Sequence, residues 1–417
     1  MAKFDYQKKF EALVNQGLFS SLESSDFEFI KVEAFKYYFS FQEAKILSTW
    51  SLDLRLWQEG SIRKIWPEGI ENKKELLEKL QERYEEIKNT KKDYSSFVPE
   101  RRVRREVKLG PTPFEDRILG LCPVASEKTR CCNLETLDAA RNCGFDCSYC
   151  SIQSFYHDDT VLIDKNLKDK LEKLLIDPHK TYHIGTGQSS DSLMWGNKNG
   201  ILEALVAFAR KYPNVILELK TKSANVSELL ELKPPRNVIV TWTLNTETII
   251  KNEEFLTASL EERLDAAQKV SQAGLLIGFH FHPMVYYKGF ESEYEEVTQK
   301  LLGRFKSENV ALLSIGTLTY TKTVMSKIRK RGLQSKILQM PLKEIAGKFS
   351  YPREIKVELF KTLYQSFSPW HGKVFFYMCM EDPTLWKDVF GFEFQSNEEF
   401  EESMKKAYFL KINTVSL

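Results

Sequence analysis

The feature that most constrains this chain is a short cysteine-rich loop, CGFDCSYC, at residues 143–150. Its three cysteines, Cys143, Cys147 and Cys150, are separated by three and by two residues. Thiolates this close together can hold three irons of a cubane iron–sulfur cluster and leave the fourth iron without a protein ligand. A structural zinc site is the alternative, but it needs four ligands, usually in two separated pairs, and no second pair follows at finger-like spacing. The spacing therefore predicts a 4Fe-4S cluster with one open iron.

Size, charge and cysteine usage limit the class of protein. A length of 417 residues predicts two or three domains or one elaborated barrel. The formal net charge of +2 argues against a bulk polyelectrolyte binder, so nucleic acid would have to be bound by local basic patches. The first residues, MAKFDYQKKF, are too charged for a signal peptide, and no apolar run is long enough to span a membrane. Together with an odd number of cysteines, seven, these features predict a cytoplasmic protein.

The apolar pattern divides the chain into three predicted domains. Residues 1–105 form a helical N-terminal domain, because apolar side chains recur at helical spacing, most clearly in ENKKELLEKLQERYEEIK. Residues 106–340 alternate short β-rich runs with helical stretches, the pattern of βα units around a parallel sheet or barrel. Residues 341–417 are predicted to form a small C-terminal extension that packs on the barrel.

Six strands are predicted in the barrel, which gives an α/β fold with a partial (β/α)6 architecture. The first lies near LETLDAA, and the others lie within 181–193, 215–223, 237–245, 275–286 and 310–320. The cysteine loop follows the first strand, and the ends of strands form the catalytic face of such barrels. Gly185, Thr186 and Gly187, at the end of the second strand, suit the close approach of a ligand to the backbone.

Several segments resemble successive blocks of the spore photoproduct lyase family, which belongs to the radical S-adenosylmethionine (SAM) enzymes. Besides the cysteine loop, they are ELKTKSANV, VTWTLNTETIIKNEE, TASLEERLDAAQKVSQAG, GFHFHP, SIGTLTY and YMCMEDPTLW. The resemblance implies a 4Fe-4S cluster that binds SAM at its open iron and cleaves it reductively to a 5'-deoxyadenosyl radical. It implies that this radical abstracts hydrogen from damaged or modified nucleic acid, with electrons from a donor such as flavodoxin or ferredoxin.

The resemblance also assigns roles to individual residues. It gives the three loop cysteines to the cluster and places Tyr149 beside SAM and the substrate. The positions that match SAM contacts are Ser190, Lys220 and Thr243. His282 stands where the family usually has an aspartate, which suggests an altered contact to substrate or cofactor. Because His280 and His282 alternate along a strand, both should lie on one face, as a metal site or, more simply, as a hydrogen-bonded lining of the site.

Two departures from the family pattern predict altered radical chemistry. A cysteine that returns a hydrogen atom to the repaired thymine is replaced here by Gln188, whose N–H bonds are too strong to take over that role. Ser151 replaces the tyrosine that follows the third cluster cysteine in the family, so Tyr149 remains alone. We therefore expect SAM cleavage with poor or no clean repair of spore photoproduct. Cys379 or a thiol of the substrate is a candidate substitute donor.

The other cysteines and the basic residues leave further alternatives open. Cys122, Cys131 and Cys132 could hold an auxiliary cluster, but adjacent cysteines seldom bind the same metal, so a structural role is expected. The stretch 321–343 is basic without one acidic residue, which predicts a phosphate-binding surface or a solvated helix face, and RRVRRE at 101–106 is a second basic run. Two other classes of function remain: a radical enzyme acting on a small molecule or protein, and a nucleic-acid-binding protein with a structural or sensing cluster.

Overall fold

The structure is a computed structural model that describes residues 2–14, 18–100, 109–112, 118–122, 129–152, 160–187, 189–345 and 347–414. The chain forms two compact units. One unit comprises Met1–Arg101, Tyr286–Lys288 and Thr319–Pro352, and the other comprises Arg102–Val285, Gly289–Leu318 and Arg353–Leu417. The three-domain division stays a prediction, and the compact units group the chain differently, because residues 319–340 join the N-terminal helices and residues 353–417 join the barrel.

The first unit is mainly helical, as predicted for the N-terminal domain. Its helices are α1 (Ala2–Val14), α2 (Ser24–Tyr37), α3 (Phe41–Leu56), α4 (Lys73–Asn89) and α11 (Lys322–Lys330). A small antiparallel sheet has the order β13 (Thr319–Tyr320), β15 (Lys348–Ser350), β14 (Lys343–Ile345). A capping box of Ser40 and Glu43 starts α3, and the side chain of Asn72 caps α4. On α4, Leu76, Leu80 and Tyr84 are buried, so the apolar stripe of the sequence is core.

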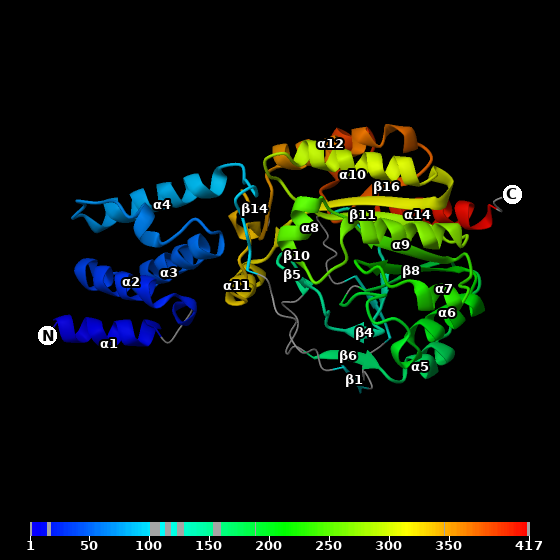
Figure 1. Ribbon diagram of the computed structural model, residues 1–417, viewed down its shortest axis with the longest axis horizontal. Helices are drawn as coiled ribbons and strands as arrows, with labels where there is room; N and C mark the ends of the chain where they lie inside the picture. The colour runs from blue at the N-terminus through cyan, green and yellow to red at the C-terminus, as the bar shows by residue number, and fades with distance from the viewer. Residues whose placement is uncertain are drawn as a thin grey trace. The chain divides into compact units, whose positions relative to one another are not determined.

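The second unit is built on a curled eight-stranded sheet with the order β16-β12-β11-β9-β8-β7-β3-β2 (Figure 1). Its strands are β2 (Leu119–Leu121), β3 (Glu135–Leu137), β7 (Tyr182–Thr186), β8 (Val215–Thr221), β9 (Val238–Thr243), β11 (Leu276–Met284), β12 (Val310–Thr317) and β16 (Phe375–Met378). All neighbours from β3 to β16 pair in parallel, and β2 pairs antiparallel with β3. The predicted partial barrel is confirmed, and β16 adds a strand from the segment predicted as an extension.

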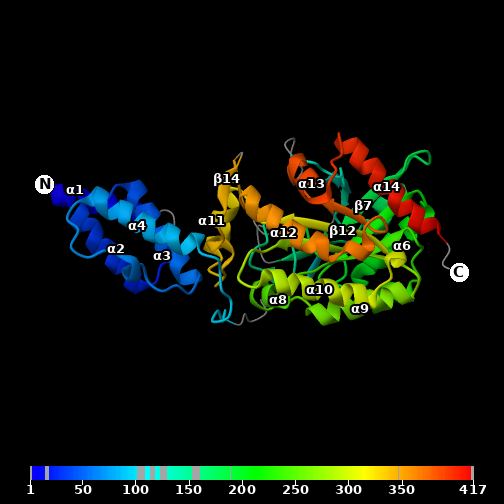
Figure 2. The same ribbon diagram turned by 90° about the horizontal axis from the view of Figure 1, so that it is seen from above.

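Helices cover the outer face of this sheet because its strands are nearly continuous apolar runs that need cover on both faces. Every residue of β9 is buried, for example. The helices are α5 (Leu167–Lys173), α6 (Ile201–Lys211), α7 (Ser227–Glu231), α8 (Glu247–Glu253), α9 (Leu260–Gln272), α10 (Phe290–Arg304) and α12 (Arg353–Ser366). Figure 2 shows α9, α10 and α12 side by side. No helix in the described ranges is long and apolar enough to cross a membrane.

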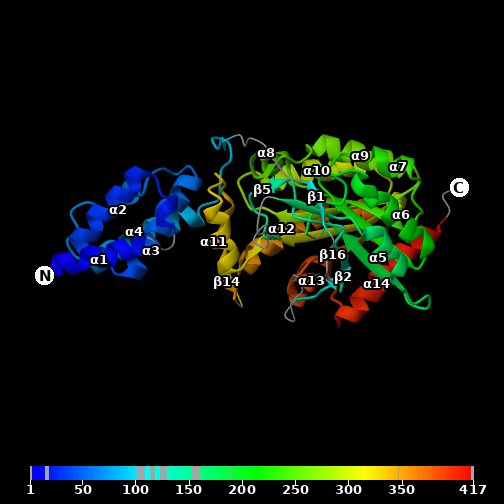
Figure 3. The ribbon, with the colours of Figure 1, turned by 90° about the horizontal axis from the view of Figure 1, so that it is seen from below.

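The segments that follow the two edge strands of the curled sheet, β2 and β16, meet at an isolated bridge. The backbone N–H of Arg130 donates to the carbonyl of Glu381 (3.0 Å), so the segment after β2 lies against the segment after β16. Helices α13 (Pro383–Phe390) and α14 (Asn397–Asn413) follow, and Figure 3 shows α14 beside β16 and β2. Buried aromatic side chains of α14 pack on β16, as in the pairs of Phe400 with Phe375 and Tyr377. This helix therefore covers the half-barrel where the sheet does not close.

Short strands around the cysteine loop complete the unit. A three-stranded sheet has the order β1 (Leu109–Thr112), β6 (Val161–Asp164), β4 (Ala140–Arg141). A two-stranded ladder joins β5 (Asp146–Cys147) in the loop to β10 (Glu254–Phe255). The loop is thus tied to residues that lie far away in the sequence.

Candidate active site

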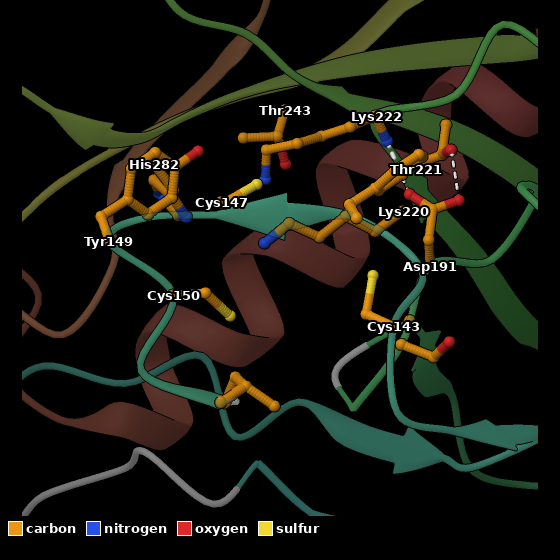
Figure 4. Close-up of a pocket in the computed structure, with 14 residues that line it drawn as sticks. Cys143, Cys147, Tyr149, Cys150, Asp191, Lys220, Thr221, Lys222, Thr243 and His282 are labelled. Atoms are coloured by element: carbon orange, nitrogen blue, oxygen red, sulfur yellow. Dashed lines mark hydrogen bonds between the residues drawn. The ribbon is translucent and has the colours of Figure 1, made fainter. Parts of the chain in front are cut away.

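A cavity of about 180 Å³ lies within the second unit, between the cysteine loop and the ends of β7, β8, β9 and β11 (Figure 4). It has the position predicted for a catalytic site, at the carboxyl ends of parallel strands. The predicted site residues that line it are Cys143, Cys147, Tyr149, Cys150, Gly187, Ser190, Lys220, Thr243 and His282. The segment 134–282 therefore folds so that most of the predicted site residues lie around one cavity.

The three cysteine side chains face a common space, and the side chains of Lys220 and Lys222 extend into it (Figure 4). Burial raises the pKa of the Cys147 thiol to about 12, although Lys222 acts in the opposite direction. A thiolate there needs a positive partner, which the irons of a cluster supply. Within the described ranges, no three His, Cys, Asp or Glu side chains converge as ligands of a single metal ion, whereas a cubane takes its ligands on separate irons. The residues present fit such a cluster.

The loop is held by contacts at several points. The backbone N–H of Ser148 donates to the carbonyl of Glu253 (2.8 Å), and the hydroxyl of Ser148 donates to the Glu253 carboxylate. The hydroxyl of Ser190 donates to the carbonyl of Asn142 (2.6 Å), just before the first cysteine of the loop. An added Cβ at Gly144 would lie 2.5 Å from Met194 Cε and 2.9 Å from Trp195 Cη2, so these side chains would have to shift to admit a larger residue. The loop therefore packs closely against the turn after β7.

Tyr149 is buried, and its hydroxyl donates to Glu254 Oε1 (2.5 Å). The other oxygen of Glu254 accepts from Arg263 (2.6 Å), and both side chains of this ion pair are fully buried. Arg263 also donates to the carbonyls of Thr243 (2.8 Å) and Ala258 (2.9 Å). Burial alone would raise the pKa of Glu254, but Arg263 and Lys222 hold it below its ordinary value. The ion pair thereby positions Tyr149 beneath the loop and supports the strand end at Thr243.

A buried aspartate organises the opposite wall. Asp191 Oδ1 accepts from Thr221 Oγ1 (2.7 Å) and from the backbone N–H groups of Leu193 (3.0 Å) and Met194 (2.9 Å). Its other oxygen accepts from the backbone N–H of Lys222 (2.7 Å). The carboxylate thereby joins the turn after β7 to the end of β8.

Gly185 and Gly187 were both predicted to approach a ligand at the end of β7, but of the two only Gly187 lines the cavity. Gly187 lines the cavity at φ +81°, and an added Cβ would lie 2.8 Å from the carbonyl oxygen of Lys220. Gly185 and Thr186 do not line this cavity, because the space beside Gly185 is filled by Leu134 and the Thr186 hydroxyl lies 2.6 Å from that of Ser192. Gln188 lies outside the described residues.

Sequence reasoning missed some residues of the site. Lys222, Asp191 and Thr221 line the cavity, and Glu254 and Arg263 hold Tyr149. The sequence does contain a signal for Lys222. Glu218, Lys220 and Lys222 alternate along an otherwise apolar strand and just beyond its end, so their side chains are expected on one face. The expected common face of His280 and His282 is confirmed, since both rings hydrogen-bond the hydroxyl of Ser314.

Four cysteines lie outside the loop: Cys122, Cys131, Cys132 and Cys379. Hydrogen bonding to Cys131 and burial raise the pKa of Cys132 well above its ordinary value. Cys379 follows β16 and is half-buried, and burial raises the pKa of its thiol to about 12. The structural role of Cys122, Cys131 and Cys132 stays a prediction.

The basic stretch 321–343 is not a uniform positive surface. Arg329 is mostly buried and pairs with the buried Asp53 (Nε to Oδ1, 2.7 Å). Lys336 is buried and pairs with Glu59 (3.2 Å). Lys322, Lys327, Lys330 and Lys343 are exposed, and Lys322 pairs with Glu344 (3.1 Å). The stretch therefore contributes both to the core of its unit and to its surface. The run 101–106 lies outside the described residues.

Comparison with known proteins identifies the family. The sequence model of one protein family, described as Spore photoproduct lyase, matches residues 134–359, more than half of the chain. The chain belongs to the spore photoproduct lyase family. The matched segment contains the whole lining of the cavity.

Relatives within the spore photoproduct lyase family are distant. A spore photoproduct lyase of Clostridium acetobutylicum is 27% identical over 221 residues, which cover 52% of this chain and 64% of the relative. One of Bacillus subtilis is 34% identical over 85 residues, which cover 20% of this chain and 25% of the relative. The chain thus matches less than two thirds of the length of either protein.

Solved structures of spore photoproduct lyase share the fold. A complex with dinucleoside spore photoproduct has a TM-score of 0.57 at 18% identity, covering 65% of this chain and 82% of that one. A variant with bound AdoMet and dinucleoside spore photoproduct has a TM-score of 0.52 at 20% identity, covering 58% and 75%. The likeness supports the half-barrel architecture described above.

Proposed function

We propose that this protein is a cytoplasmic radical SAM enzyme of the lyase class that acts on damaged or modified nucleic acid. The observation that carries the proposal is the single cavity that Cys143, Cys147 and Cys150 share with Lys220 and Lys222. Family membership supports the same conclusion. When bound, a 4Fe-4S cluster supplies the electron that cleaves SAM to a 5'-deoxyadenosyl radical, and a donor such as flavodoxin or ferredoxin replenishes it.

The residues of this chain bind and orient the reactants. The three cysteines hold the cluster, and Lys220 and Lys222 place positive charge where SAM has a carboxylate. The backbone at Gly187 and the side chains of Ser190, Thr243 and His282 form the remaining wall of the SAM site, with Gly185 and Thr186 shaping the strand end behind it. Tyr149, whose hydroxyl donates to Glu254, would lie beside the reacting groups. Burial of this cavity on several sides limits the access of water to the radical.

The substrate is proposed to differ from spore photoproduct itself. Spore photoproduct lyases donate hydrogen from a cysteine at the position of Gln188, and a carboxamide does not provide an abstractable hydrogen. Cys379 is the proposed alternative donor in this chain. A radical enzyme that acts on a small molecule or protein is the second candidate. Gln188 in place of the donor cysteine argues against repair of a thymine lesion and is compatible with such a substrate.

The test uses anaerobically reconstituted full-length protein with SAM and dithionite. We expect a reduced-cluster electron paramagnetic resonance signal that changes on addition of SAM, and formation of 5'-deoxyadenosine. With a synthetic spore-photoproduct dinucleotide, thymine should form in few or no turnovers, and Gln188→Cys should raise that number. Stoichiometric zinc without iron would refute the cluster. Many wild-type turnovers to thymine, unaffected by Cys379→Ala, would show a true spore photoproduct lyase.

We propose that the exposed lysines of α11 bind nucleic acid. Their neighbour Arg329 is mostly buried and is expected to affect stability instead. Lys327→Ala and Lys330→Ala should each lower the slope of log affinity against log salt by about one and leave stability within about 0.5 kcal/mol. Arg329→Ala should instead lower the free energy of unfolding by about 3–5 kcal/mol, because it leaves the Asp53 carboxylate buried without its ion-pair partner and with the hydroxyl of Tyr84 as a remaining donor. Fluorescence anisotropy at several salt concentrations and urea unfolding measure the two effects. An unchanged salt slope in the lysine variants would exclude this surface.

A further inference from the structure

A chain of hydrogen bonds crosses the interior of the half-barrel. Glu218 on β8 accepts from His183 Nε2 (2.8 Å) at one carboxylate oxygen. At the other it accepts from His280 Nε2 (2.7 Å) and Thr241 Oγ1 (2.8 Å). All four side chains are buried. The carboxylate therefore connects β7, β8, β9 and β11 inside the barrel.

The chain continues from His280 to the cavity through Ser314 on β12. His280 Nδ1 lies 2.6 Å from the hydroxyl oxygen of Ser314, and the same oxygen lies 3.0 Å from His282 Nε2. Ser314 is buried, whereas His282 lines the cavity. A buried carboxylate is thus linked to a cavity residue through one imidazole and one hydroxyl.

The charge of Glu218 decides where the protons lie, because a carboxylate only accepts hydrogen bonds. Burial would raise the pKa of Glu218, but His280 and His183 hold it well below its ordinary value. Burial lowers the pKa of His280 to about 4, so this ring is neutral at pH 7 and has one proton. That proton lies on Nε2, toward Glu218, and Nδ1 of His280 therefore accepts from the Ser314 hydroxyl.

The same argument assigns the proton positions on the next ring, that of His282. The Ser314 hydroxyl has only one proton, and since it donates this proton to His280, its oxygen accepts from Nε2–H of His282. Burial holds the pKa of His282 well below its ordinary value, although a backbone hydrogen bond with Ile315 acts in the opposite direction, so this ring is neutral too. Its other nitrogen, Nδ1, consequently has a lone pair and no proton.

We propose that Glu218 is a positioning residue that holds His282 in the Nε2–H tautomer, so that the cavity presents His282 Nδ1 as an uncharged hydrogen-bond acceptor. The identity of the ligand rests on the proposed function: SAM has an ammonium group and ribose hydroxyls that can donate to such an acceptor. The tautomer itself does not depend on SAM. An uncharged acceptor does not compete, as a carboxylate would, for the side chains of Lys220 and Lys222, so both remain available to anionic groups of the ligand.

The first test measures the tautomer in the full chain without any ligand. Two-dimensional NMR of protein labelled with ¹⁵N in its six histidines distinguishes protonated from bare ring nitrogens, and the His282 signals are those lost in His282→Asn. We expect a proton on Nε2 and a bare Nδ1 at pH 7. Ser314→Ala removes the acceptor of Nε2–H and should raise the Nδ1–H population of His282 at least severalfold. Thr241→Val, which leaves Glu218 bonded to His280, is the matched control and should change nothing.

A proton on Nδ1 in the wild-type protein, or a doubly protonated His282 at pH 7, would overturn the proposal. So would an equal shift of the His282 tautomer in Thr241→Val and Ser314→Ala, because the effect would then reflect general packing.

The second test asks whether Nδ1 is the nitrogen that the ligand uses. The amide oxygen of asparagine reaches the position of Nδ1, whereas that of glutamine reaches the position of Nε2. In reconstituted protein, His282→Asn should keep SAM affinity within about threefold, and His282→Gln should weaken it about tenfold or more. The reverse order would refute the acceptor role. A wild-type protein that binds no SAM would refute the proposed function, while the tautomer measurement would still stand.

Discussion

Replacing Cys147 by alanine is expected to remove the iron–sulfur cluster and with it all SAM cleavage. The wild-type protein should contain about four irons per chain after anaerobic reconstitution, and the variant fewer than one. The reason is that two remaining thiolates cannot hold a cubane that already has one iron without a protein ligand. Because the backbone pairing of Cys147 with Glu254 is kept in the variant, the variant should fold normally.

Iron and sulfide analysis, the reduced electron paramagnetic resonance signal and 5'-deoxyadenosine formation measure this effect. Cys122→Ala is the matched control, because it removes a partly buried thiol that does not line the cavity. The control should keep wild-type iron and SAM cleavage. If Cys147→Ala kept its iron and its signal, the loop would not hold the cluster.

The second large effect is expected from Arg263→Met. The side chain of Arg263 is fully buried and donates to Glu254, Thr257, Thr243 and Ala258. Its removal leaves the Glu254 carboxylate buried with one ion-pair partner fewer, which should lower the free energy of unfolding by about 3–5 kcal/mol. SAM cleavage should fall as well, because Glu254 then no longer holds Tyr149 in a fixed position.

Urea unfolding at pH 7 measures the stability. Lys79→Ala is the control, since it breaks an exposed ion pair with Glu75 on α4 and should cost at most about 0.5 kcal/mol. Adding Glu254→Gln to Arg263→Met should recover part of the loss, because the buried charge is then gone. A loss below about 1 kcal/mol for Arg263→Met would contradict the role assigned to this ion pair.

Local sequence patterns predicted those parts of the site that depend on residues close together in the sequence. The cysteine spacing identified the loop, and the alternation of His280 and His282 along β11 placed both rings on one face, as the hydrogen bonds to Ser314 confirm. Both signals depend only on residues a few positions apart, whose geometry the backbone fixes.

Contacts between distant segments could not be predicted in this way. Arg329 looked like part of a phosphate-binding surface, but its partner Asp53 is 276 residues away, and their pairing buries the guanidinium. The hydroxyl of Tyr149 bonds Glu254, which is 105 residues away, in a stretch whose own pattern is that of a helix end. Strand β16 lies in the segment predicted as an extension, and its four residues are too few for a periodic signal that would place it in the sheet.

The pairing of the cysteine loop with β10 has a consequence for biosynthesis. Ser148 is anchored by Glu253, which is synthesised 105 residues later. At about 5–20 residues per second, this delay lasts roughly 5–20 s. During that interval the three thiols of the nascent chain lack the contact that anchors Ser148, so the proposed cluster would be inserted after translation has passed β10.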